Sequence, residues 1–290
     1  MDWFVFALMA AVLASAAVIL EKKSLLREHA MQFSAVLALF NLAISIPFFL
    51  VIDYSWVTFE LLLLIYVASV LATIAFLLVI KSVRHMEVSL SSPLLVLAPA
   101  FTAVIAYFAL GESLTVIQIS GIGLLILGSY VLETKPRQGL LQPLKEFKSS
   151  KYIHFILLAL FFYGITTVVD RYVLSSFDVQ PMAYLAFAHL FIAINFFIMI
   201  SIFHDGIKDI RLGLKHAGWI IFLVAILTVG HRLAQMQAIQ LAYAGLVIAI
   251  KRMSAFFVVL IGGEIFHEKN LLRKSIACLI MIGGAALIVL

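Results

Sequence analysis

The ionisable residues that could do chemistry in this chain gather inside one apolar stretch, between His231 and Arg252. His231 and Arg232 lie about ten residues before a turn expected near 241–244, and Lys251 and Arg252 lie about nine residues after it. A hairpin of two helices would place both basic pairs at one depth, roughly 12–15 Å from the turn at 1.5 Å per residue. An arginine fork and a lysine ammonium at adjacent positions can hold the oxygens of one anion. The stretch therefore predicts an anion-binding site.

Polar neighbours extend this site along the helix before the turn. Thr228, His231 and Gln235 share one helical face at three- and four-residue spacing, next to Arg232. The predicted substrate-binding residues are Lys251, Arg252, Arg232, His231, Gln235 and Thr228. The alternative is structural, because buried histidines often serve packing and long basic side chains can reach from a helix to the membrane interface.

Three other residues are candidates for a gate or for ion coupling, namely Asp170, Arg171 and His189. Asp170 is the one carboxylate expected near the depth of the cations, and it stands next to Arg171. Each embedded cation costs about 2.5–3.5 kcal/mol at a helix centre on insertion scales. The three cations would therefore keep an excess of positive charge, which an exchangeable anion in a water-filled cavity could offset.

The composition is that of an integral membrane protein. Hydrophobic residues make up 64% of the 290 positions, charged residues 12%, and the mean hydropathy is +1.16. A bilayer accommodates that much apolar surface, whereas a water-soluble domain does not. The net charge of +5 comes from basic residues in short loops, so it does not indicate a nucleic-acid partner. A single cysteine, Cys278, excludes an internal disulfide, and we expect no metal site and no cofactor.

Ten apolar segments are each long enough to cross a hydrocarbon core of roughly 30 Å as helices. They span approximately 2–20, 30–52, 58–80, 87–110, 114–132, 151–174, 181–203, 217–240, 244–265 and 271–290. Pro93 and Pro99 are expected to kink the fourth of them. The first is interpreted as a retained helix, not a cleaved signal, because Asp2 stands where a basic residue is usual.

The loops between the segments carry a strong charge bias. The odd-numbered loops hold sixteen basic residues, whereas the even-numbered loops and both termini together hold one, Arg171. Because basic loops remain in the cytoplasm, the odd-numbered loops are predicted to be cytoplasmic and both termini to lie outside. The expected location is the cell (plasma or inner) membrane, with the lipid bilayer as a partner.

A basic linker divides the chain into halves of five helices. The predicted units are residues 1–134, the cytoplasmic linker 135–150, and residues 151–290. Because five is odd, two related halves would cross the membrane in opposite orientations. A shift of 156 residues aligns Glu112 with Glu268, Gly128 with Gly284, and Phe101 with Phe257. The predicted fold is all-α, with ten transmembrane helices in two inverted five-helix repeats.

The run Gly111-Glu112-Ser113-Leu114-Thr115, followed by Gln118 and Gly121, resembles the GE-x-LT-x-x-Q-x-x-G turn of the drug/metabolite transporter superfamily. On this resemblance the chain is identified as a ten-helix, two-repeat permease of the EamA type. Lys251-Arg252 also resembles the Lys-Arg pair with which plastid phosphate translocators of that superfamily hold phosphate. Glu112 and Glu268 are interpreted as structural residues that favour the N-terminus of the next helix.

The favoured function is secondary active transport of a small organic anion, carrying phosphate or carboxylate, by alternating access. The alternative is a proton-coupled exporter of amino acids or amphipathic drugs. An intramembrane enzyme acting on a lipid phosphate is disfavoured, because the chain lacks DxxD, HExxH and GxSxG, and no catalytic residue is predicted. The partner is a small-molecule substrate, and a homodimer is one of the oligomeric states left open.

Overall fold

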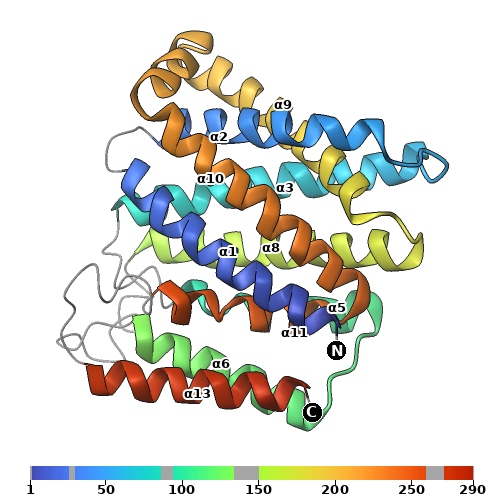
Figure 1. The fold of residues 1–290 in the computed structure, drawn as a ribbon, viewed down its shortest axis with the longest axis vertical. Helices are drawn as coiled ribbons and strands as arrows, with labels where there is room; N and C mark the ends of the chain where they lie inside the picture. Colours follow the sequence, from blue (N-terminus) through green and yellow to red (C-terminus); the bar gives the residue numbers. More distant parts are fainter. Residues whose placement is uncertain (1, 26–29, 86–93, 134–149, 259–270, 290) are drawn as a thin grey trace.

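The computed structural model describes residues 2–25, 30–85, 94–133, 150–258 and 271–289 (Figure 1). Regular structure in these ranges consists of ten α-helices and one short 3₁₀ helix. They are α1 (Asp2–Leu25), α2 (Ala30–Ser45), η1 (Ile46–Leu50), α3 (Phe59–His85), α5 (Ala98–Leu110), α6 (Val116–Glu133), α8 (Lys151–Ser176), α9 (Pro181–Phe203), α10 (Ile207–Leu241), α11 (Ala244–Lys251) and α13 (Leu271–Val289). The all-α membrane fold is confirmed.

Each of the ten predicted segments contains one of these α-helices, and six helices are long and apolar enough to span a membrane on their own. Three helices extend at least five residues past a predicted boundary. α1 continues to Leu25 instead of residue 20, α3 continues to His85 instead of residue 80, and α10 begins at Ile207 instead of residue 217. Hydropathy marks the part of a helix that lies in lipid, but a helix continues wherever its polar side chains reach water. Lys208, Arg211 and Lys215 are accordingly exposed on the first turns of α10.

Two helices are interrupted at equivalent positions of the two halves. Residues 94–95 are helical, a turn follows at 96–97, and α5 begins at Ala98 with Pro99 in its first turn. In the second half α11 ends at Lys251, a turn follows at 252–253, and residues 254–258 are helical. The two turns are 156 residues apart, the same shift that aligns the repeats. The segment 87–110 is thus interrupted next to Pro99, where a kink was expected, whereas no interruption was expected in the segment 244–265.

Pro99 explains the first interruption, because it lacks a backbone N–H and restricts the residue before it. Pro93 lies outside the described residues. The second interruption has no proline, and it coincides with the basic pair. Backbone hydrogen bonds continue through both turns, because the N–H groups of Leu97, Arg252 and Met253 donate to carbonyl oxygens three or four residues earlier.

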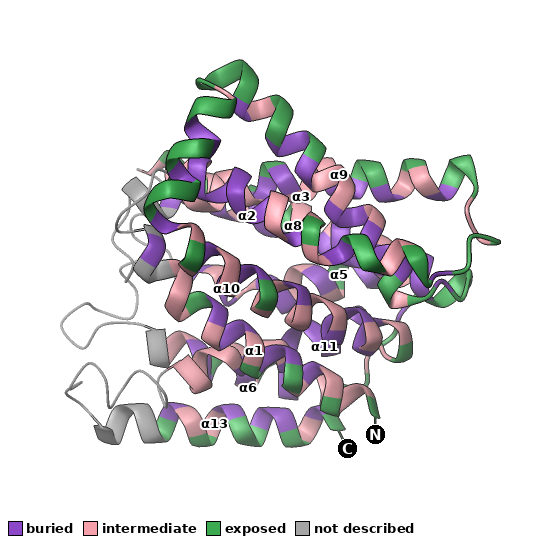
Figure 2. Ribbon diagram, turned by 45° about the horizontal axis from the view of Figure 1, so that its top comes forward, coloured by how far each residue is buried: buried purple, intermediate pink, exposed green. Residues whose placement is uncertain are grey.

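Both termini lie on one side of the molecule, together with the connections 51–58, 111–115, 177–180 and 242–243 (Figure 1). We call this the termini side. The connection between α9 and α10, at 204–206, lies on the opposite side. Buried and exposed residues alternate along single helices such as α13, as expected for helices that face both the protein and lipid (Figure 2).

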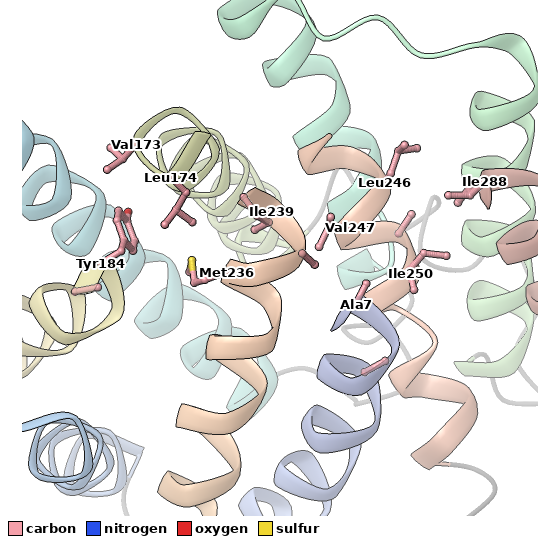
Figure 3. Packing of buried hydrophobic residues seen from close by; sticks show 14 of the residues in the cluster. Ala7, Val173, Leu174, Tyr184, Met236, Ile239, Leu246, Val247, Ile250 and Ile288 are labelled. Carbon is pink, nitrogen blue, oxygen red and sulfur yellow. The ribbon is translucent and has the colours of Figure 1, made fainter. Parts of the chain in front are cut away.

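The apolar core is continuous toward the termini side and divided elsewhere. The largest cluster joins both halves and includes Ala7, Ile65, Tyr184, Met236 and Val247 (Figure 3). A second cluster joins α2, α9 and α10, and a third joins α5, α8 and α11. The second and third clusters do not share a residue among those described, and a cavity lies between them.

The last helices of the two halves, α6 and α13, pack against each other through glycines. A Cβ atom at Gly121 would lie 2.7 Å from the carbonyl oxygen of Gly284, and one at Gly128 would lie 2.6 Å from Cγ of Met281. Gly123 and Gly283 face open space instead. Gly121, Gly128 and Gly284 therefore form the close contact between the two helices, whereas Gly123 and Gly283 lie on their outer faces.

Candidate functional site

A cavity of about 410 Å³ lies in the middle of the bundle. Helices α1, α2, α3 and α5 of the first half and α8, α9, α10 and α11 of the second half contribute to its lining. It extends from mid-helix positions away from the termini side, as far as Glu21 near the end of α1 and Ser34 near the start of α2. All six predicted binding residues line it, namely Thr228, His231, Arg232, Gln235, Lys251 and Arg252.

Lys251 is the last residue of α11 and is held by a neighbour from α10. Its Nζ donates a hydrogen bond of 2.5 Å to Oε1 of Gln235, whose side chain is buried. This bond places Lys251 level with Gln235, about one helical turn from His231, and it gives Gln235 a role in positioning the lysine. α10 ends at Leu241 and α11 begins at Ala244, so the predicted turn is present.

The predicted turn joins α10 to α11, although the two helices make only limited direct contact. α1 packs along α10 and also contacts α11, and it lies between them in Figures 1 and 3. The packing of α1 explains this separation. Its side chains are small and apolar where it inserts between the two helices, at Ala7, Ala10, Ala11 and Ala14. Because of this separation, the cations of the two helices surround a cavity instead of contacting each other directly.

Glu21 was missed by the reasoning from sequence. It lies near the end of α1, lines the cavity, and is close enough to Lys251 for an electrostatic attraction. The predicted helix ended at residue 20, so Glu21 was counted with the first loop instead of with the membrane. An acidic residue directly after an apolar segment was the available signal. The cavity therefore contains one carboxyl group and the side chains of one lysine and two arginines among its described lining residues.

Three polar atoms among the lining residues are buried without a hydrogen-bond partner. They are Oδ1 of Asn41, Oγ1 of Thr228 and Nδ1 of His231. A buried polar atom without a partner costs about 1–3 kcal/mol, so such atoms usually find a protein group, water or a ligand. His189 differs, because its Nδ1 shares a hydrogen bond of 2.7 Å with Oγ of Ser45. His189 lines the cavity and stays a candidate for coupling.

Asp170 and Arg171 lie outside the cavity lining. Asp170 is buried and accepts a hydrogen bond of 2.5 Å from the hydroxyl of Tyr184. Its carboxylate is near enough to Arg232 and Lys251 for electrostatic attraction, as the sequence suggested. Arg171, although adjacent to Asp170 in the chain, points to other partners.

Arg171 is the centre of a group that we call the termini-side clamp. Its Nε donates to Oε1 of Glu112 at 3.0 Å, and its Nη1 donates at 2.7 Å to the carbonyl oxygens of Ile239 and Gln240. Glu112 accepts a second bond of 3.0 Å from the N–H of Ala244, the first residue of α11. Glu112 thus favours a helix N-terminus, but that of α11 instead of the next helix, α6.

The cavity brings together three basic side chains, those of Arg232, Lys251 and Arg252. Two arginines and a lysine can surround a phosphate or carboxylate with charge-assisted hydrogen bonds. No group of three His, Cys, Asp or Glu side chains that could hold a metal is found in the described part of the chain. Glu264, His267 and Glu268 lie outside the described residues.

Comparison with known proteins places this geometry in context. A profile described as the EamA-like transporter family matches residues 1–134 and 150–290. A search of curated protein sequences returns no match. A solved structure, titled only as the crystal structure of a protein, superposes with a TM-score of 0.75 at 14% identity, over 99% of this chain and 96% of that one. That similarity establishes a shared fold.

Proposed function

Because the chain belongs to the EamA-like transporter family, we propose that it is a secondary active carrier for a small organic anion. The family makes it a membrane transporter of the drug/metabolite type. The carried group is a carboxylate or a phosphate, bound by Lys251, Arg252 and Arg232 in the central cavity. Transport proceeds by alternating access, with the cavity opening in turn to each side of the membrane.

One observation supports the anionic substrate above all others. Lys251, Arg252 and Arg232 line the same cavity, and Glu21 is the one carboxylate among its described lining residues. The excess charge is costly in a membrane interior, where ions need partners. An anion that enters the cavity offsets it, and the buried Thr228 hydroxyl and His231 ring are available to bind its oxygens.

The core and the clamp suggest which side is closed. The continuous apolar cluster and the termini-side clamp lie between the cavity and the termini, whereas two separate clusters flank the cavity elsewhere. We propose that this conformation is open away from the termini and that Arg171 belongs to the gate. With the loop charges, that opening faces the cytoplasm and the termini lie outside.

The test is uptake of labelled anions into proteoliposomes that contain the purified protein. Lys251→Gln and Arg252→Gln should each reduce exchange of a carboxylated or phosphorylated substrate by at least 100-fold, since each removes a charge that the bound anion needs. Thermal unfolding should be affected much less, because glutamine keeps most of the side-chain volume and each change removes a charge from the membrane interior instead of adding one.

Lys151→Gln is the matched control, since Lys151 is exposed at the start of α8 and does not line the cavity. It should transport at the rate of the unmodified protein. Exchange that survives both Lys251→Gln and Arg252→Gln would refute the anion site. Thermal stabilisation by neutral amines, with none by carboxylates or phosphates, would do the same.

A further inference from the structure

The two halves contribute different chemistry to equivalent positions of the cavity. With the shift of 156 residues, Ala72 of α3 corresponds to Thr228 of α10, and Phe76 corresponds to Arg232. All four residues line the cavity. The repeat symmetry therefore places an apolar surface on the first half where the second half carries a hydroxyl and a guanidinium.

The same contrast holds at the broken helices. Lys251 and Arg252 correspond to Leu95 and Val96, which belong to or pack against apolar clusters. Among the described lining residues, every basic side chain comes from the second half. Glu21 is the one charged lining residue that the first half contributes.

The hydroxyl groups that the first half contributes to the cavity are bonded within their own helices. Ser34, Thr73 and Thr102 each donate to the carbonyl oxygen four residues earlier on their own helix, at 2.7–3.0 Å. A hydroxyl bonded in this way presents mostly its methyl or methylene group to the cavity. Phe76 packs edge-on against Phe196 of α9, which also lines the cavity, with ring centroids 5.9 Å apart. The part of the wall around Phe76 and Phe196 is thus apolar and aromatic, whereas Asn41 of α2 contributes an amide oxygen elsewhere in the lining.

We propose that the substrate is amphipathic, with its anionic end on the basic residues of α10 and α11 and an apolar group against Ala72 and Phe76 of α3. This inference rests on the proposed function and specifies its substrate class. The cavity of about 410 Å³ has room for such a group beyond the anion. A phosphorylated sugar fits less well, because its hydroxyls would lose water against this wall and find few free partners.

The test is a binding series of straight-chain carboxylates, from acetate through butanoate to hexanoate, measured by thermal shift of the detergent-purified full chain. Each methylene buried against an apolar wall should raise affinity about threefold to fourfold. Hexanoate should therefore bind at least 50-fold more tightly than acetate. The same series is measured on Lys251→Gln as a control. Any dependence on chain length that remains there reports partition of the acids into the detergent micelle, because that partition needs no cation.

A second measurement locates the apolar contact. Phe76→Ser should lower the ratio of hexanoate to acetate affinity at least fivefold, and Phe76→Leu, which keeps an apolar side chain, should lower it less. Phe203→Ser is the matched control, because Phe203 is 68% exposed at the end of α9. It should leave the ratio unchanged.

The outcomes separate this inference from the function on which it rests. A flat series in the unmodified protein, with acetate binding that still depends on Lys251, overturns the amphipathic substrate and leaves the anion carrier standing. Equal ratios in Phe76→Ser and Phe203→Ser overturn the assigned wall. Equal binding of every acid to the unmodified protein and to Lys251→Gln refutes the anion site itself.

Discussion

The two ends of the helix bundle are held together in different ways. On the termini side, one apolar cluster joins both halves, and the termini-side clamp ties α8, α10, α11 and the 111–115 turn at a single point. On the other side, two polar contacts among the described residues each join a pair of neighbouring helices. Gln32 of α2 donates to Asp209 of α10 at 2.7 Å, and Ser82 of α3 donates to the carbonyl oxygen of Tyr152 of α8 at 3.1 Å.

This difference indicates how the molecule could change conformation. A clamp that crosses the middle of the bundle must break for the cavity to open on that side. Contacts within one wall, such as Gln32 with Asp209, can persist while the walls move apart. The clamp is therefore expected to control both the stability of the fold and access to the cavity. The contacts within one wall are expected to affect stability alone.

The largest effect is expected from breaking the clamp. Arg171→Met leaves Glu112, which is 7% exposed, without its cation, and the cost of such a change is about 3–5 kcal/mol. The variant should unfold at a distinctly lower temperature in detergent. A double variant, Arg171→Met with Glu112→Gln, should recover part of the loss because no buried charge is left unpaired. If the single variant is as stable as Arg211→Met, an exposed control on α10, the clamp has no structural role.

A smaller effect is expected where the halves meet outside the cavity. Gly128→Val forces a side chain against Met281 and the carbonyl oxygen of Ala277, which lies 2.8 Å from the ideal Cβ position. Overpacking of this kind costs about 1–3 kcal/mol, so the unfolding temperature should fall. Gly123→Val, on the same helix with no atom within 4 Å, should be neutral. Equal stability of the two variants would contradict the α6–α13 contact.

The smallest effect is expected at the wall contact on the side away from the termini. Gln32→Leu removes one hydrogen bond to Asp209, which still accepts from the N–H of Asp205, so the loss should be about 1 kcal/mol. Transport should continue at nearly the normal rate, as measured in proteoliposomes. Gln180→Leu is the control, because Gln180 is exposed and makes no side-chain cap bond. A Gln32 variant that abolishes transport would show that this end is also a gate.

Much of the fold could be predicted because the bilayer imposes a simple rule. Every apolar stretch of adequate length must form a helix, since backbone groups have no other partner in lipid. The interruptions at 96–97 and 252–253 could not be predicted in the same way. Pro99 gave a partial signal for the first interruption. Lys251 and Arg252 are compatible with a continuous helix, so the second interruption depends on the cavity around them.

The candidate site was predictable in part for a similar reason. Cations are rare in apolar helices, so Arg232, Lys251 and Arg252 stand out on spacing alone. Glu21 did not stand out, because it falls at a helix end where charged residues are usual. Its place beside the cavity results from the way α1 packs between α10 and α11, which no local pattern specifies.

The sequence by itself therefore determined the membrane class, the ten helices, the weak repeat and the excess of basic residues in the second half. Those properties follow from hydropathy and spacing, which act locally along the chain. Only the tertiary structure decided that Arg171 joins Glu112 and not the cavity, that Gln235 holds Lys251, and that Phe76 lines the same cavity as Arg232. The two hydrogen-bonded pairs lie 59 and 16 positions apart in the chain, and helix packing alone selects them.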